Sequence, residues 1–158
     1  MHKSRKRQPV KKTVSQQAGI GNIPGTFHVG TSDYSLALLS YDAHSSSMRH
    51  AKDFTSSQQT PLSVIVNIIK EEPHRKHIML FNNFFDDALL EEVQKTFAIH
   101  SLTLEDVVNL HQRSKYDAYD HYDACIIDTY TAIHEKSQIS LLLTKDCILV
   151  FDPAADLD

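Results

Sequence analysis

Hydrophobic and polar positions along this chain follow two different periods, and together they predict both strands and helices. Short apolar runs bounded by Gly, Ser, Asn or Asp are typical of β-strands. Such runs predict strands at 26–29, 35–41, 49–54, 77–82, 124–133, 138–143 and 147–151. We expect a tight turn between the first two of these strands and a hairpin turn at 134–137.

Two segments between these strands carry helical signals. Pro61 opens a run that ends at Glu72, and we interpret this run as a helix although its β-branched residues fit neither period cleanly. Asp86 and Asp87 suit the start of a second helix, because carboxylates accept bonds from its first amides and face the positive end of its dipole. This helix should run to about Ala98, with a buried stripe at helical spacing formed by Leu89, Leu90, Val93 and Phe97.

A third, short helix is predicted at 104–110, after a break at 99–101. Thr103 and Asp106 stand three residues apart in a capping-box pattern, in which hydroxyl and carboxylate satisfy the first free amides of a helix. Asp106 therefore has a possible structural role before any ligand is considered. The residues expected to face inward are Leu104, Val107, Val108 and Leu110.

The alternation of strands and helices predicts an α/β or α+β layered domain, built on a mixed β-sheet flanked by helices. A length of 158 residues fits one such domain. We expect residues 1–22 to form a basic flexible leader and residues 23–158 to form the folded domain.

Charge is distributed unevenly along the chain. Residues 1–12 hold six of the sixteen Lys and Arg residues and none of the twenty acidic ones, so residues 13–158 carry ten bases against twenty acids. The leader is interpreted as solvated and disordered, or as able to contact anionic lipid or nucleic acid. The acidic body argues against a nucleic-acid-binding domain, which would present a clustered basic face, and suits a protein that handles cations.

Nothing in the pattern predicts membrane crossing or export. A bilayer span needs about 20 mostly apolar residues in succession, whereas the longest apolar runs here are short. The basic N-terminus is followed by polar residues and not by the apolar core of a signal peptide. Cys125 and Cys147 lie in strand-like surroundings without a CxxC motif, so two reduced thiols are expected instead of a disulfide. These features favour a soluble chain in the cytosol.

No recognised enzyme motif is found in the sequence. The glycines at 19–25 miss the last glycine of a dinucleotide-binding loop, and neither a Walker loop nor a Gly-x-Ser-x-Gly elbow occurs. An acidic cluster comprises Asp117, Asp120, His121, Asp123 and Asp128. On extended chain its members point to alternate faces, so a single converging metal site is not expected there. The histidines also lack the spacing of a closed zinc site, and the domain is expected not to be an enzyme.

The segment 97–113 reads FAIHSLTLEDVVNLHQR, and it closely resembles a signature of the cytosolic domain of CorA-type magnesium transporters. Pro24-Gly25, the strand at 78–82 and the run SLLLTKDCILVF at 140–151 match the same family in the same order. Ser101 and Ser114 stand where the family usually has proline.

This resemblance implies a CorA soluble-domain fold, an α/β/α sandwich, and a regulatory role. In the family, acids at the positions of Glu105 and Asp106 help to form divalent-ion sites between neighbouring subunits, and His111 is a further candidate ligand on the same surface. The resemblance implies Mg²⁺ or Co²⁺ as the regulatory ion, bound weakly because Mg²⁺ keeps several waters and takes one or two protein carboxylates.

The resemblance also implies a longer parent protein. The family's stalk helix, two transmembrane helices and Gly-Met-Asn pore signature are not found in these 158 residues, so we expect a fragment of a homopentameric transporter. Its domain would lie on the cytoplasmic side of the membrane and touch the membrane only through those missing helices. The alternative function is a soluble ligand-binding or protein-interaction module that keeps the fold without sensing ions.

Overall fold

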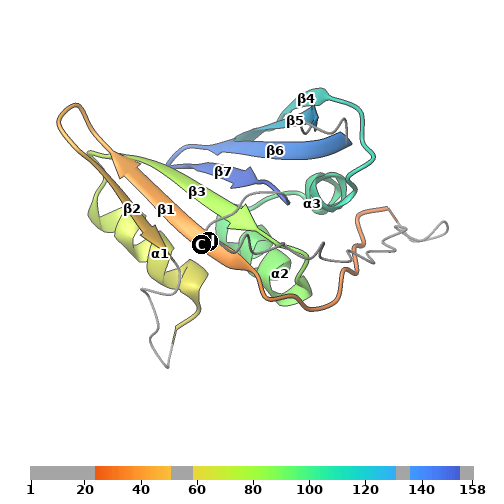
Figure 1. Cartoon of the computed structure of the whole chain (residues 1–158), viewed down its shortest axis with the longest axis horizontal. Helices are drawn as coiled ribbons and strands as arrows, with labels where there is room; N and C mark the ends of the chain where they lie inside the picture. The colour runs from red at the N-terminus through yellow and green to blue at the C-terminus, as the bar shows by residue number, and fades with distance from the viewer. Residues whose placement is uncertain (1–23, 51–58, 131–135, 154–158) are drawn as a thin grey trace, which may run out of the picture.

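The computed structural model describes residues 24–50, 59–130 and 136–153. Its elements are drawn in Figure 1. In chain order they are β1 (Ser35–Tyr41), β2 (Ser46–His50), α1 (Pro61–Glu71), β3 (Lys76–Asn82), α2 (Asp87–Phe97), α3 (Ser101–Val108), β4 (Lys115–Ala118), β5 (Tyr122–Tyr130), β6 (Lys136–Thr144) and β7 (Ile148–Phe151). The predicted leader at 1–22 lies outside the described residues.

The strands form one seven-stranded mixed sheet in the order β2-β1-β3-β7-β6-β5-β4. Neighbouring strands are antiparallel except at the centre, where β3 and β7 run parallel with Ile78 opposite Ile148 and Phe81 opposite Phe151. Three antiparallel strands on one side, β2-β1-β3, and an antiparallel meander on the other, β7-β6-β5-β4, therefore meet at a single parallel junction.

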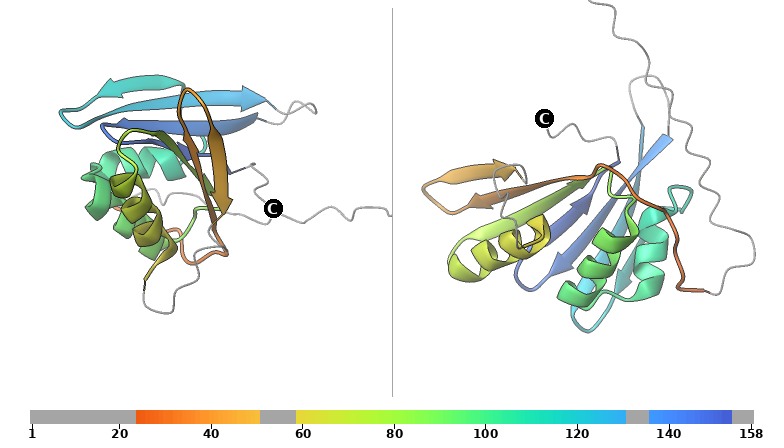
Figure 2. Two further views of the ribbon diagram at one scale, coloured as in Figure 1. Left: turned by 90° about the vertical axis from the view of Figure 1, so that its left-hand side faces the viewer. Right: turned by 90° about the horizontal axis from the view of Figure 1, so that it is seen from below.

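All three described helices lie on the same face of this sheet (Figure 2). The strands alternate, so every second side chain points toward the helices and joins one continuous core. From the strands, this core takes Leu36, Leu38, Met79, Phe81, Tyr122, Ala124, Leu142, Leu149 and Phe151. The α/β class with a mixed, helix-flanked sheet is thus confirmed, and the helices among the described residues cover one of its two faces.

Aromatic rings pack across the parallel junction. The rings of Phe81 and Phe151 stack with centroids 4.4 Å apart, and Phe84 meets Phe151 edge-on at 5.2 Å. All three rings are almost fully buried. Because these rings come from β3, from β7 and from the loop before α2, they join the two halves of the sheet to the helical layer.

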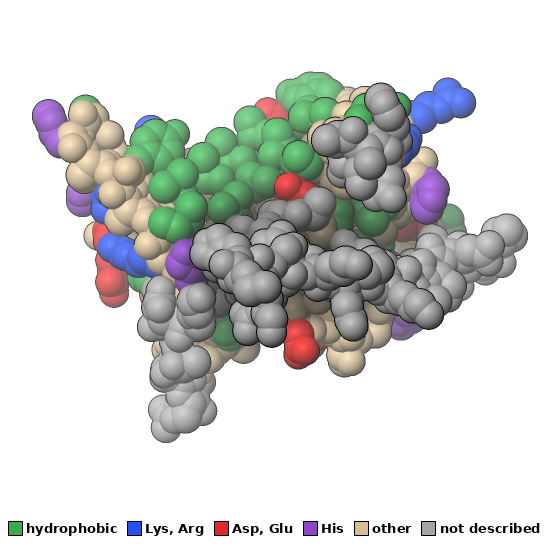
Figure 3. All heavy atoms as spheres, viewed as in Figure 1, with side chains coloured by type: hydrophobic (Ala, Val, Ile, Leu, Met, Phe, Trp, Pro, Cys, Tyr) green, Lys and Arg blue, Asp and Glu red, His purple; other side chains and the backbone are tan. Residues whose placement is uncertain are grey.

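The other face of the sheet is apolar and partly open to solvent. Its alternate residues include Tyr41, Met48, Ile127 and Leu143, which are between 38% and 47% exposed. Figure 3 shows hydrophobic side chains gathered on the side of the molecule that faces the viewer in Figure 1. A strand face of this composition is unusual at a free surface, where large contiguous apolar patches commonly mark contact sites.

The predicted helices at 61–72 and 87–98 are confirmed. In α1, Thr60 accepts a bond from the Ser63 amide and Pro61 occupies the first turn, while Leu62, Ile65 and Ile69 are buried. Burial of this stripe outweighs the weak helix preference of its β-branched residues.

The second helix begins as the acidic pair predicts. Asp86 caps α2 by accepting from the Leu89 amide at 2.8 Å, and Ala98 ends the helix in the left-handed conformation with φ of 52°. Asp87 accepts from the amides of Val29 and Gly30, at 2.8 Å and 3.3 Å.

The predicted strand at 26–29 is wrong. This segment is irregular, because the Val29 amide bonds to the side chain of Asp87 instead of to a neighbouring strand. The first hairpin is formed by β1 and β2, and the Asp42 carboxylate accepts from the amides of His44 and Ser45 at its turn.

Two further strand boundaries differ from the prediction. The strand expected at 49–54 begins earlier, at Ser46, and residues 51–54 lie outside the described part. The strand expected at 124–133 begins at Tyr122 and is described to Tyr130. Of the turn predicted at 134–137, residues 134 and 135 lie outside the described part, and Lys136 and Ser137 already belong to β6, because they pair with Tyr130 and Thr129. Cys125 and Cys147 are free thiols, as the sequence predicts.

We expect the Phe151→Ala variant to lower the free energy of unfolding by about 3–5 kcal/mol, because it removes a ring that is packed on both sides. Urea denaturation followed by circular dichroism measures this change. Tyr130→Ala is the matched control, since Tyr130 is 69% exposed on β5, and it should change stability by less than about 1 kcal/mol. Equal losses in the two variants would contradict a central role for the junction.

Burial raises the pKa of the Cys147 thiol to about 11, from an ordinary 9.0. The unfolded thiol therefore ionises first as pH rises, so the stability that Cys147 contributes is complete below pH 9.0 and is lost toward pH 11. We expect wild-type stability to fall by about 2 kcal/mol more than that of Cys147→Ala between these limits. Urea denaturation at each pH measures the difference, and parallel curves would contradict it.

Candidate cation site on helix α3

Helix α3, which carries the predicted acidic pair, begins three residues earlier than predicted. It starts at Ser101, and its cap is His100, whose Nδ1 accepts from the Leu102 amide at 3.2 Å. The predicted capping box of Thr103 and Asp106 is therefore wrong, since Thr103 already lies inside the helix. Asp106 therefore does not cap α3, and its carboxylate contacts Lys115 instead.

Tyr122 fixes the start of α3 against the sheet. Its hydroxyl oxygen accepts from the His100 amide at 3.0 Å and lies 2.7 Å from the Thr103 Oγ1. Tyr122 and Thr103 are both buried, so these bonds form away from bulk water. The hydroxyl replaces the capping interaction that the sequence pattern assigned to Asp106, and it frees the Asp106 carboxylate for other partners.

Glu105 and Asp106 are adjacent and half-buried, but each contacts a different neighbour. The Gly25 amide donates to Glu105 Oε2 at 2.7 Å, whereas Lys115 Nζ lies 2.6 Å from Asp106 Oδ2. Gln138 Nε2 also donates to the backbone carbonyl of Asp106 at 3.2 Å. The acidic pair is thus held between the N-terminal segment and the sheet.

Lys115 is shared between two carboxylates. Its Nζ lies 2.6 Å from Asp106 Oδ2 and 3.2 Å from Asp117 Oδ2. The hydrogen bond to Asp106, more than the contact with Asp117, raises the pKa of Lys115, so the amine stays charged at neutral pH. A positive group is therefore already present where a bound cation would meet Asp106.

His111 is exposed on the loop after α3, and its backbone amide donates to Asn109 Oδ1 at 3.3 Å. Within the described residues, no group of three or more His, Cys, Asp and Glu side chains is arranged to hold a metal ion. Of the three predicted ligands, Glu105 and Asp106 share a helix turn, but no closed site forms around them.

The described residues around α3 offer a divalent cation two carboxylates but no closed set of ligands. Mg²⁺ prefers hard oxygen ligands, keeps much of its water and needs only one or two carboxylates. Glu105 and Asp106 supply such oxygens at a partly accessible surface. Further ligands would have to come from water or from another chain.

The acidic cluster on β4 and β5 is divided among separate contacts. Asp117 pairs with Lys115, and Asp128 Oδ1 lies 3.1 Å from Lys136 Nζ. Asp123 lies opposite Ala118 in the sheet. The pair of Asp117 with Lys115 lies within β4 and that of Asp128 with Lys136 joins β5 to β6, so the cluster does not converge on one point.

Sequence reasoning missed Gly25, Lys115 and Tyr122. Gly25 has φ of 85°, and a Cβ there would lie 2.7 Å from Ser101 Oγ, so the close approach to α3 needs glycine. The Pro24-Gly25 pair was a visible turn signal, but its contact with Glu105 spans 80 positions. No local signal links Lys115 or Tyr122 to α3, since both come from strands that follow it.

Comparison with known proteins was made by family model, by sequence and by structure. No family model matches the chain. The chain is 38% identical over 68 residues to the cobalt/magnesium transport protein CorA of Thermotoga maritima. This match covers 40% of the present chain and 19% of the other protein. The chain thus spans about a fifth of the length of this relative.

The fold is similar to that of the soluble domain of CorA from Methanocaldococcus jannaschii, with a TM-score of 0.50 at 10% identity. This match covers 75% of the present chain and 40% of the other. The sequence match and the fold match thus both lead to CorA proteins, as the signature at 97–113 predicts. Both comparisons lead to a transport protein or its soluble domain and not to an enzyme. None of the described helices has the length and apolar character required to span a bilayer.

We expect Tyr122→Phe to destabilise the domain by about 1–2 kcal/mol, because the His100 amide and the Thr103 hydroxyl lose their shared partner. Urea denaturation gives the size of the loss. Hydrogen exchange should show faster exchange in the first turn of α3. Tyr130→Phe removes the same atom at an exposed position and should change neither measurement. Unaltered exchange in Tyr122→Phe would show that the hydroxyl does not hold this helix.

Proposed function

We propose that this chain, whose sequence and fold are similar to those of a CorA soluble domain, is the cytosolic regulatory domain of a divalent-cation transporter. Glu105 and Asp106 are its sensing residues in this proposal. The observation that carries it is the adjacent carboxylate pair on α3, held at a partly accessible surface in the segment that resembles the CorA signature. The name of the similar Thermotoga maritima protein supports a role in cobalt or magnesium transport.

Lys115 gives the proposed sensor its weak affinity. A cation that binds Asp106 must take the place of an ammonium group 2.6 Å from the carboxylate, and this ammonium then retains Asp117 as a partner. The attraction between the cation and Asp106 is thus partly offset by the lost contact with the ammonium, so the net free energy of binding is small. A site of this kind responds over a range of free cation concentrations instead of being permanently filled.

The longer parent protein belongs to the same proposal. The similar CorA protein is about five times as long as the part matched here, so most of its length has no counterpart in this chain. We propose that the parent continues into stalk and membrane helices, assembles as a homopentamer and transports Mg²⁺ or Co²⁺. The missing ligands of the sensor would come from a neighbouring subunit, with this domain on the cytoplasmic side.

A second candidate function is an interaction module that keeps the fold without sensing ions. The specific observation that favours it is the Lys115 contact, because an acid already paired with a lysine can be purely structural. The half-exposed apolar face of the sheet also suits a domain that binds other protein surfaces.

Mg²⁺ titration of variants separates the two candidates. We expect wild-type chain to bind Mg²⁺ weakly and Lys115→Met to bind it about two- to fivefold more tightly, because the competing ammonium is removed. Asp106→Asn should abolish the response. Chemical-shift changes at the amides of α3 measure each affinity.

Lys136→Met is the matched control, since it removes a lysine that pairs with Asp128 and not with Asp106. Its Mg²⁺ affinity should equal that of wild type. If Lys115→Met and Asp106→Asn both left the titration unchanged, the interaction-module function would be favoured. Thermal denaturation of every variant establishes that each one is folded.

A further inference from the structure

A cavity of about 310 Å³ lies where the end of α1, the start of β3 and the turn between β6 and β7 come together. No residue of the candidate cation site lines it. Its lining residues are Ile69, Lys70, Pro73, Arg75, Lys76, His77, Lys145 and Asp146. Two segments that are far apart in the sequence, 69–77 and 145–146, thus contribute to a single concave surface.

The charge around this cavity is opposite to that of the domain. Residues 13–158 contain ten Lys and Arg residues and twenty acidic ones. Four of these ten bases line the cavity, whereas only one of the twenty acids does. An average part of this acidic domain would contain more acids than bases. The cavity has more bases than acids, so it attracts negatively charged ligands.

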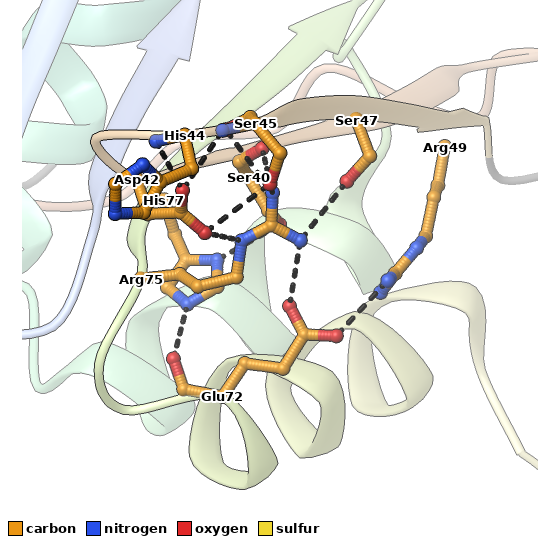
Figure 4. Close-up of polar contacts among 9 residues, drawn as sticks. All are labelled: Ser40, Asp42, His44, Ser45, Ser47, Arg49, Glu72, Arg75 and His77. Carbon is orange, nitrogen blue, oxygen red and sulfur yellow. Dashed lines mark hydrogen bonds and ion pairs between the residues drawn. The ribbon is translucent and has the colours of Figure 1, made fainter.

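Arg75 is fixed by the carboxylates behind it (Figure 4). Its Nε lies 3.4 Å from Asp42 Oδ2 and its Nη1 lies 3.6 Å from Glu72 Oε2, while Nη2 donates to the Ser40 carbonyl at 2.9 Å. Glu72 also accepts from Arg49 at 2.9 Å, and this hydrogen bond is the main cause that lowers the pKa of Glu72. Arg75 therefore belongs to a balanced network that forms one wall.

His77 completes the rigid part of the cavity. Its Nε2 lies 3.0 Å from the Glu72 carbonyl, and because a carbonyl oxygen only accepts, Nε2 carries the proton. Its Nδ1 lies 3.0 Å from Ser40 Oγ. Both ring nitrogens have partners, and the residue is buried. His77 therefore supports the wall of the cavity, but it has no ring nitrogen left to bind a ligand.

The uncommitted charges are three lysines. Lys70, Lys76 and Lys145 are exposed, and within the described part of the chain none of them forms an ion pair. They come from α1, from β3 and from the β6–β7 turn, so three lysines from different elements line the same cavity. Asp146 is the single acidic residue that lines the cavity.

We propose that this cavity binds a phosphate-bearing anion, with Lys70, Lys76 and Lys145 as the groups that neutralise it. The volume exceeds that of one phosphate group and falls at the lower end of the range for small-molecule sites. Ile69 and Pro73 provide an apolar wall for the part of the ligand beyond its phosphate. The site is independent of the cation-sensing proposal, because it shares no residue with α3.

Pyrophosphate is the probe for the site, titrated into the complete 158-residue chain at constant ionic strength. We expect saturating chemical-shift changes confined to amides around 69–77 and 144–147. Lys76→Gln/Lys145→Gln should weaken the binding about tenfold or more, since each charged contact is strong. Asp146→Asn should tighten it, because the opposing charge is removed.

Lys95→Gln/Lys136→Gln is the matched control, since it removes the same charge at two lysines that lie outside the cavity and pair with Glu91 and Asp128. It should bind pyrophosphate as wild type does. Equal weakening by the two double variants, or shifts spread over all lysines, would overturn the proposal. Thermal denaturation of each variant should give the same curve as wild type, because these lysines are exposed and their side chains do not support the core. Equal curves show that the variants are folded.

A second arm distinguishes a free phosphate ligand from a lipid headgroup. Co-sedimentation with vesicles of phosphatidylcholine alone, or mixed with phosphatidylglycerol, is compared for the two double variants. All the variants keep the basic residues at 1–12, so any binding by that segment is common to them. If only Lys76→Gln/Lys145→Gln lost sedimentation with the vesicles, the ligand would be a lipid headgroup. If the site bound pyrophosphate but this double variant still sedimented as wild type does, the ligand would be a soluble phosphate. Absence of both responses would refute the site.

Discussion

The parallel pairing of β3 with β7 is the contact on which the rest of the domain depends. The two strands are far apart in the chain, and their junction is packed by Phe81, Phe84 and Phe151. Because β7 must return to the centre of the sheet, α2, α3 and the three strands before β7 are forced to fold around this point. Pairing of β3 with β7 closes a long loop, and the chain loses conformational entropy before the contacts of the junction stabilise it. Forming this junction therefore has a large entropic cost.

This closure creates the surroundings of α3. It brings Tyr122 of β5 beneath the first turn, Lys115 of β4 to Asp106, and Gln138 of β6 to the Asp106 carbonyl. The acidic pair is therefore presented by a helix whose position is set by the sheet. A change in the charge at Asp106 acts directly on Lys115 and the edge strand, which gives the proposed sensor a short physical route from ion to structure.

The same closure separates charges of opposite sign. Carboxylates of α3, β4 and β5 gather with Lys115 and Lys136, while unpaired lysines from α1, β3 and the β6–β7 turn gather around one cavity. Sequence composition shows only the average, an acidic body with few bases. Coulomb interactions fall off over about 8–10 Å in physiological salt, so the local arrangement and not the net charge decides which ion each surface attracts.

Several features follow from the sequence by itself because their causes lie within a few residues. The cap of α2 by Asp86, the apolar stripe of α1 and the alternation along β3 are local, and the signature at 97–113 indicated the CorA-like fold. Only tertiary structure decided that 26–29 is irregular, that α3 starts at Ser101 and that Asp106 meets Lys115. Each of these depends on a partner brought near by the β3–β7 junction, and no local propensity encodes that distance.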